Sequence, residues 1–154
     1  MYPNDFIALL HNPTLWIAAF ACVSAQVMKV LIEFAYTRKM SLHMVLSTGG
    51  MPSSHSALVV AMATSVGKVE GLHTPLFAAA LVFALIVMHD AAGVRRAAGK
   101  QAKVLNMMLE NLENQGIKLD EKLKELLGHS PIEVIAGAIW GVSSALVAHM
   151  IILY

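Results

Sequence analysis

Apolar residues gather into four long runs, and this pattern constrains the fold more than any other feature of the chain. The runs over residues 14–34 and 131–153 are long enough to cross about 30 Å of hydrocarbon at about 1.5 Å per residue. The run over 74–90 is almost continuously apolar, and the run over 54–67 is short for a full crossing. With 57% hydrophobic and 14% charged residues, we predict an all-α integral membrane helical bundle, a single domain over residues 1–154 with about four transmembrane helices.

Two charged segments separate the third run from the fourth. In residues 97–113, apolar side chains such as Val104, Leu105 and Met108 recur at helical spacing while lysines and glutamates occupy other faces. Residues 120–127 repeat the pattern on a shorter scale. We therefore predict two cytoplasmic amphipathic helices, whose Met and Leu stripe serves packing or membrane contact. No cofactor and no nucleic-acid partner is expected.

Residues 49–56, with the sequence Gly-Gly-Met-Pro-Ser-Ser-His-Ser, have the composition of an anion site at the start of a helix. Two glycines let a backbone approach a ligand closely, and Pro52 suits a first helical turn. Unpaired N–H groups at a helix N-terminus attract phosphate, and His55 follows as a proton donor. The alternative is an ordinary capped helix start.

With four crossings, the end of the first run, the start of the second, the end of the third and the start of the fourth emerge on one side of the membrane. Ten of the eleven lysines and arginines belong to that side, so the positive-inside rule predicts that it faces the cytoplasm of a bacterial-type inner or plasma membrane. The candidate site residues at these four ends are Lys29, Arg38, Ser53, Ser54, His55, Asp90, Arg95, Arg96, His129 and Glu133.

Lys29 is the one of these residues that lies well inside an apolar run, where it shares a helical face with Gln26 and Glu33. An ionisable group there is costly unless it faces protein or water, which favours a functional role. The alternative is a lysine whose stem lies along lipid and whose amine reaches the headgroups.

The chemistry of the set suits an anion with several oxygens, most simply phosphate. The cations disfavour a bare divalent metal, so no metal site is predicted. His129 and Glu133 are one helical turn apart, which allows the carboxylate to orient the imidazole. An oriented histidine acts as nucleophile or base, and a second histidine protonates a leaving oxygen. The residues that would be metal ligands under the alternative interpretation are His55, His89, Asp90, His129 and Glu133.

Three ordered motifs resemble the type 2 phosphatidic acid phosphatase (PAP2) superfamily, which includes the vanadium haloperoxidases. Residues 52–55 (Pro-Ser-Ser-His) are similar to its P-S-G-H motif, and residues 128–137 resemble its third motif, in which a histidine precedes an acidic residue by four. With the Asp-Ala-Ala-Gly-Val-Arg-Arg segment over residues 90–96, nearly the whole chain looks like the divergent branch of that superfamily.

The resemblance implies a role for each site residue. His129 would be the nucleophile that forms a phosphohistidine, Glu133 its orienting partner, and His55 the general acid. Lys29 and Arg38 would stand for the first motif's phosphate-binding pair. The remaining phosphate donors implied by the resemblance are Ser53 and Ser54.

Several positions depart from the superfamily pattern. Tyr36 occupies the place of the first-motif arginine, and Leu123 occupies that of the third-motif arginine. We expect Arg95 or Arg96, held by Asp90, to supply the missing charge. Glu133 also stands where the superfamily usually has aspartate. Four crossings instead of six would leave the pocket partly open, and a homodimer or the amphipathic helices would close it.

The sequence therefore predicts a metal-independent membrane phosphatase that hydrolyses a lipid phosphomonoester or diphosphate at the cytoplasmic face. The principal alternative is a non-enzymatic membrane protein that binds anionic headgroups or a partner through the same pocket. A soluble-type vanadate haloperoxidase is a third and weaker alternative, because an apolar chain at a membrane suits lipid substrates better.

Overall fold

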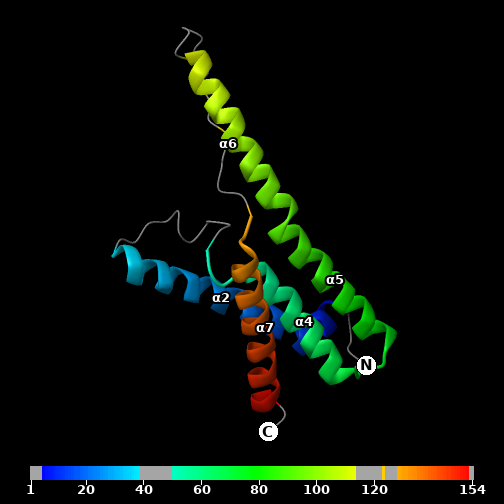
Figure 1. The fold of residues 1–154 in the computed structure, drawn as a ribbon. Helices are drawn as coiled ribbons and strands as arrows, with labels where there is room; N and C mark the ends of the chain where they lie inside the picture. The colour runs from blue at the N-terminus through cyan, green and yellow to red at the C-terminus, as the bar shows by residue number, and fades with distance from the viewer. Residues whose placement is uncertain (1–4, 39–49, 114–122, 124–127, 153–154) are drawn as a thin grey trace.

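The computed structural model describes residues 5–38, 50–113, 123 and 128–152, and these residues form helices without strands. The protein is an all-α membrane helical bundle (Figure 1). Three stretches are long and apolar enough to cross a membrane: Pro13–Thr37, Pro75–Asn111 and Pro131–Ile151. The helices, in chain order, are α1 (Asp5–Leu10), α2 (Pro13–Thr37), α4 (Ser54–Val69), α5 (Pro75–Ala92), α6 (Val94–Glu113) and α7 (Pro131–Ile152).

The starts of the helices follow from local sequence. A polar cap followed by proline begins α2, where Asn12 accepts the Leu15 N–H, and α5, where Thr74 accepts the Phe77 N–H. Helix α4 is different, because Ser53 is its cap and Pro52 lies before that cap. The expectation that Pro52 occupies the first helical turn is therefore wrong; the serine hydroxyl, which can accept a backbone N–H, takes the capping position instead.

Helices α4 and α7 run parallel along a seam of small residues. Gly137 meets the backbone of Ser53, Gly141 meets Ala57, and Ala145 packs with Ala61. In each of these three contacts the two residues are 84 positions apart in the sequence. A Cβ at Gly141 would lie 2.6 Å from the Ala57 carbonyl oxygen. Small residues at four-residue spacing allow two helix backbones to approach this closely, as is common in membranes. The seam brings the starts of α4 and α7 together.

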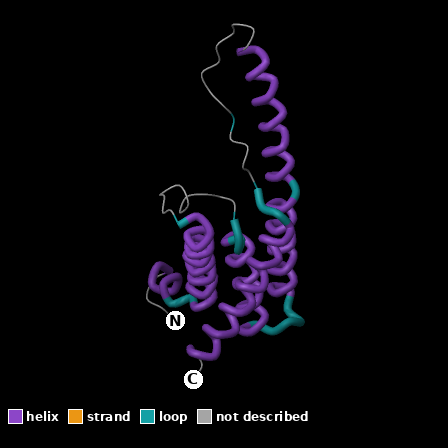
Figure 2. Tube along the Cα trace, turned by 60° about the vertical axis from the view of Figure 1, so that its left-hand side comes forward, coloured by secondary structure: helices purple, strands orange, loops and turns teal. Residues whose placement is uncertain are grey.

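Helices α2 and α5 pack against this pair in the opposite direction. Ile17, near the start of α2, lies in a cluster with Ala61 and Ala145, whereas Lys29, further along α2, lies beside Gly50. Helix α5 packs against α4 through Ala80 and Ala84. The later part of α2, the start of α4, the end of α5 and the start of α7 consequently lie at one end of the bundle (Figures 1 and 2).

Helix α4 is the shortest of these four at 16 residues, below the roughly 20 that a crossing needs. It packs against α2, α5 and α7, and its buried residues are mostly alanine and serine. Its small side chains suit this central place. The three longer helices present large apolar side chains outward, where lipid is their natural neighbour.

At the opposite end of the bundle, a polar cluster joins three helices. The Ser65 hydroxyl lies 2.9 Å from His149 Nε2 and donates to Thr14 Oγ1 at 3.1 Å. All three groups are thereby satisfied in a site where water is scarce. His149 is a packing histidine of this cluster, far from the candidate site.

We expect Ser65→Ala to lower the free energy of unfolding by about 1 kcal/mol, because His149 Nε2 loses its partner inside the bundle. Thermal unfolding in detergent, followed by tryptophan fluorescence, measures this change. An unfolding free energy equal to that of the wild type would contradict the structural role of this cluster.

Helix α6 follows α5 nearly in line and extends beyond the rest of the bundle (Figures 1 and 2). It covers the amphipathic segment expected over 97–113 and begins three residues earlier. The second amphipathic helix, expected over 120–127, lies outside the described residues except for Leu123. The Leu123 backbone is held by Asn106 of α6, whose amide accepts the Leu123 N–H at 2.9 Å and donates to its carbonyl at 2.8 Å.

Candidate functional site

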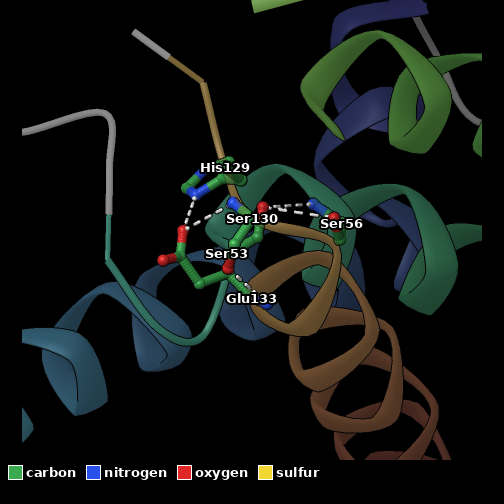
Figure 3. A network of polar contacts seen from close by, with 5 residues as sticks. All are labelled: Ser53, Ser56, His129, Ser130 and Glu133. Atoms are coloured by element: carbon green, nitrogen blue, oxygen red, sulfur yellow. Dashed lines mark hydrogen bonds and ion pairs between the residues drawn. The ribbon is translucent and has the colours of Figure 1, made fainter. Parts of the chain in front are cut away.

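His129 and Glu133 form the centre of the candidate site, immediately before and within the first turn of α7 (Figure 3). His129 Nδ1 lies 2.9 Å from Glu133 Oε2. An ionised carboxylate only accepts hydrogen bonds, so we assign the proton to Nδ1, which leaves Nε2 as the nitrogen with a lone pair. The His129 side chain is only 4% exposed. The surrounding protein and the contact with Glu133 together hold the imidazole ring in place.

The same carboxylate also begins helix α7. Glu133 Oε2 accepts the Ser130 N–H at 3.3 Å, and the Ser130 hydroxyl accepts the Glu133 N–H at 3.4 Å. These reciprocal bonds form a capping box, with Pro131 in the first helical position between them. The start of the helix thus holds Glu133 in place, and Glu133 in turn holds the imidazole.

The start of α4 is joined directly to this turn. The Ser53 N–H donates to the Glu133 carbonyl at 3.0 Å, and Ser53 Oγ accepts the Ser56 hydroxyl at 3.1 Å and its N–H at 3.4 Å (Figure 3). Ser53 is fully buried. Its backbone N–H is therefore used within the protein. Ser54 is half-buried and begins the helix, where no intrahelical carbonyl accepts its N–H.

His55 lies on the exposed side of the same turn. Its ring centroid is 6.3 Å from that of His129, with the ring planes inclined by 58°. The two rings are tilted relative to each other rather than stacked, and His55 is exposed while His129 is buried. A small anion entering from solvent would meet His55 first.

Lys29 approaches the site from α2. Its side chain is 2% exposed, and a Cβ added to Gly50 would lie 2.9 Å from Lys29 Cδ. Gly50 adopts a φ of +96°, a conformation that side chains with a Cβ rarely adopt. Lys29 therefore lies beside Gly50, enclosed by protein and not in lipid.

The end of α5 reaches the site through its backbone. The His129 N–H donates to the Ala91 carbonyl at 3.0 Å, which places the neighbouring Asp90, half-buried, at the same end of the bundle. Arg95 and Arg96 follow in the first turn of α6, and their side chains lie outside the described part of the structure.

Arg38 is placed away from this centre. It is the exposed residue that ends α2, with φ of 56°, and its N–H donates to the Phe34 carbonyl. It lies nine positions beyond Lys29, about 13 Å further along the helix, and Figure 1 shows that end of α2 running away from α7. The structure brings together His55, His129, Glu133 and Lys29, but it does not bring Arg38 to them.

Sequence reasoning missed the residues that hold the site through their backbones or caps. Ala91 acts through its carbonyl, and no side-chain pattern could have indicated it. The capping role of Ser130 could have been predicted, because Ser-Pro-Ile-Glu is a capping-box sequence. Among the described residues, no group of three or more histidine, cysteine, aspartate or glutamate side chains is arranged to hold a metal ion.

The fold and the site together define a class: a small integral membrane helical bundle in which two histidines and an acid meet where helix ends gather. Residues 10–144 match the Divergent PAP2 family, and the chain belongs to that family. The membrane protein YuiD of Bacillus subtilis (strain 168), described as uncharacterized, is 45% identical over 150 residues, which cover 90% of this chain and 95% of YuiD. No solved structure matches the chain.

Proposed function

We propose that this protein is a membrane phosphatase that hydrolyses a lipid phosphomonoester or diphosphate without a metal ion, at the cytoplasmic face. The observation that carries the proposal is the 2.9 Å contact between His129 Nδ1 and Glu133 Oε2 with a second histidine ring 6.3 Å away. Membership of the Divergent PAP2 family supports the same reaction class.

The proposed reaction has two steps. Nε2 of His129 attacks the phosphorus, a P–N bond forms, and the bond from phosphorus to the lipid oxygen breaks. His55 donates a proton to that leaving oxygen, which departs as the lipid alcohol from a monoester or as the lipid monophosphate from a diphosphate. Water then attacks the phosphohistidine, with His55 as base, and releases inorganic phosphate. Glu133 stabilises the positive charge that the imidazole acquires in the first step.

The substrate keeps its tail in lipid while its headgroup enters the site. The exposed His55 marks the entrance, and the large apolar side chains on the outer faces of α2, α5 and α7 place the bundle in hydrocarbon. Phosphatidate, phosphatidylglycerol phosphate and polyprenyl phosphates or diphosphates all fit this description. The first test is phosphate release from such a panel by the purified protein in detergent, with and without EDTA. We expect turnover of at least one lipid at a rate that EDTA does not change.

The two functions of Glu133 can be separated by a matched pair of variants. We expect Glu133→Gln to lower kcat roughly 10²-fold, because the neutral amide no longer stabilises a charged imidazole. Ser130→Ala removes the helix cap and should cost about 1 kcal/mol of stability while kcat stays near that of the wild type. Steady-state kinetics and thermal unfolding of both variants measure the difference. An equal fall of kcat in both would indicate that Glu133 only begins the helix.

A second candidate function is supported by one observation, the occupied backbone N–H of Ser53. Because this N–H is bonded to the Glu133 carbonyl, the start of α4 has one backbone donor fewer for a phosphate than the proposed hydrolysis would use. The site would then bind anionic headgroups without turnover. Lipid binding that survives in His129→Ala and His55→Ala, with no hydrolysis of any phosphate ester by the wild type, would favour this function.

A further inference from the structure

Helix α6 carries an open apolar face that the proposed reaction does not use. Four large side chains of this face are each about half exposed, from 46% at Val104 to 56% at Met108. The helix stands beyond the rest of the bundle (Figures 1 and 2). Leaving this area in water is unfavourable, at roughly 25 cal/mol for each Å². The four side chains are those of Val104, Leu105, Met107 and Met108.

The other side of α6 already has its partner. Gly99, Ala102 and Asn106 are buried, and Asn106 holds the Leu123 backbone through two hydrogen bonds of 2.8 and 2.9 Å. At 100° per residue, Asn106 and Met108 lie roughly 160° apart around the helix. Leu123 is therefore bound opposite the open apolar face.

The charges of α6 are unevenly distributed along its length. All four of its basic residues lie in its first ten positions, and both of its acidic residues lie in the last four. Lys100 and Lys103 of the basic half are exposed. This half is joined through the single residue Gly93 to α5, which is a membrane-spanning helix by length and composition. The positive end of α6 is thus the end nearest the bilayer.

We propose that α6 lies on the anionic phospholipid headgroups of the bilayer that α5 crosses, with Val104, Leu105 and Met108 inserted at the interface. A strongly amphipathic helix with a polar face rich in lysine and arginine binds such surfaces, and each basic residue near an anionic membrane contributes about 1 kcal/mol. Gly93 lies between the two helices, where a glycine allows the bend that this placement requires.

A second copy of the chain suits the face less well. Two copies inserted in one membrane with the same orientation present α6 in parallel, so their basic halves would lie side by side. Like charges on facing helices repel, whereas anionic headgroups neutralise them. The proposal goes beyond the proposed hydrolysis and does not depend on it.

The test uses the full chain in vesicles with a nitroxide at one of two positions. Cys22 is the only cysteine, so a Cys22→Ala parent accepts Met108→Cys on the apolar face and Glu110→Cys as the matched control on another face. The probe membranes are phosphatidylcholine with and without phosphatidylglycerol. For each label we measure how often the nitroxide collides with oxygen, which concentrates in lipid, and with a water-soluble nickel complex. In vesicles that contain phosphatidylglycerol, we expect the ratio of oxygen to nickel collisions to be severalfold higher at position 108 than at position 110. Adding Leu105→Glu to the Met108→Cys chain should abolish that preference.

Three results would overturn the proposal. Equal collision ratios at positions 108 and 110 would show that the apolar face is in water. An equally large difference between the two positions in phosphatidylcholine alone would show that α6 does not need anionic headgroups to bind the bilayer. Spin–spin broadening at position 108 that vanishes when labelled protein is diluted with unlabelled protein would assign the face to a second copy. The parent and labelled chains must share the same helix content and elution volume.

Discussion

Replacing His129 with alanine is expected to lower lipid-phosphate hydrolysis by a factor on the order of 10³ or more. In the proposed reaction Nε2 of this residue forms the bond to phosphorus, and Glu133 orients its ring through Nδ1. Loss of a covalent nucleophile commonly removes nearly all of the catalysed rate. The measurement is kcat/KM for phosphate release from the best lipid of the panel.

The His129 variant needs a control for folding, because its ring is buried and bonded to Glu133. Its backbone N–H bond to the Ala91 carbonyl does not depend on the side chain, so the turn is expected to persist. His149→Ala removes a buried histidine at the opposite end of the bundle and should lower stability while leaving kcat/KM near the wild-type value. Equal activity of His129→Ala and wild type would exclude the histidine mechanism.

Adding one methyl group at Gly137 is expected to lower the free energy of unfolding by about 2–3 kcal/mol, or roughly 5–10 °C in Tm. The new Cβ would overlap the Ser53 carbonyl and would lie 2.9 Å from Ser56 Cβ. The obstacle includes backbone, which has little freedom to move, so the starts of α4 and α7 must separate. Because His55 and His129 belong to those two starts, Gly137→Ala should also lower turnover.

The matched control is Val142→Ile, which also enlarges a side chain of α7 but at an exposed position. We expect this variant to change Tm by no more than the error of the measurement, since the added carbon faces lipid. Both variants are compared by thermal unfolding in the same detergent. A Gly137→Ala protein as stable as Val142→Ile would mean that the two helices are less closely packed than the structure shows.

The all-α membrane class and the family were predictable from sequence because both depend on local patterns. Long apolar runs require helices in lipid, since every backbone N–H and C=O must be satisfied within the segment. The pairing of His129 with Glu133 was also predictable, because residues one helical turn apart meet whatever the rest of the protein does.

The position of Arg38 could not be predicted from local sequence patterns. Arg38 was placed in the site because it is a cation at the correct end of the first apolar run, but α2 carries it about 13 Å beyond Lys29. Composition and topology assign a residue to an end of a helix without saying how far that helix extends. The partner of the Ser53 backbone N–H was likewise not predictable, because a serine's hydrogen-bond partners depend on which backbone groups lie nearby.

The sequence by itself determined that this chain forms a membrane helical bundle of the Divergent PAP2 family and that His129 and Glu133 form a pair. The tertiary structure alone decided that His55 lies opposite His129, that Lys29 is enclosed beneath Gly50 and that Ala91 anchors the turn. The physical reason is the range of the interactions. Caps and one-turn pairs are fixed within a few residues, whereas the distance between His55 and His129 depends on the small-residue seam that sets how closely α4 and α7 pack.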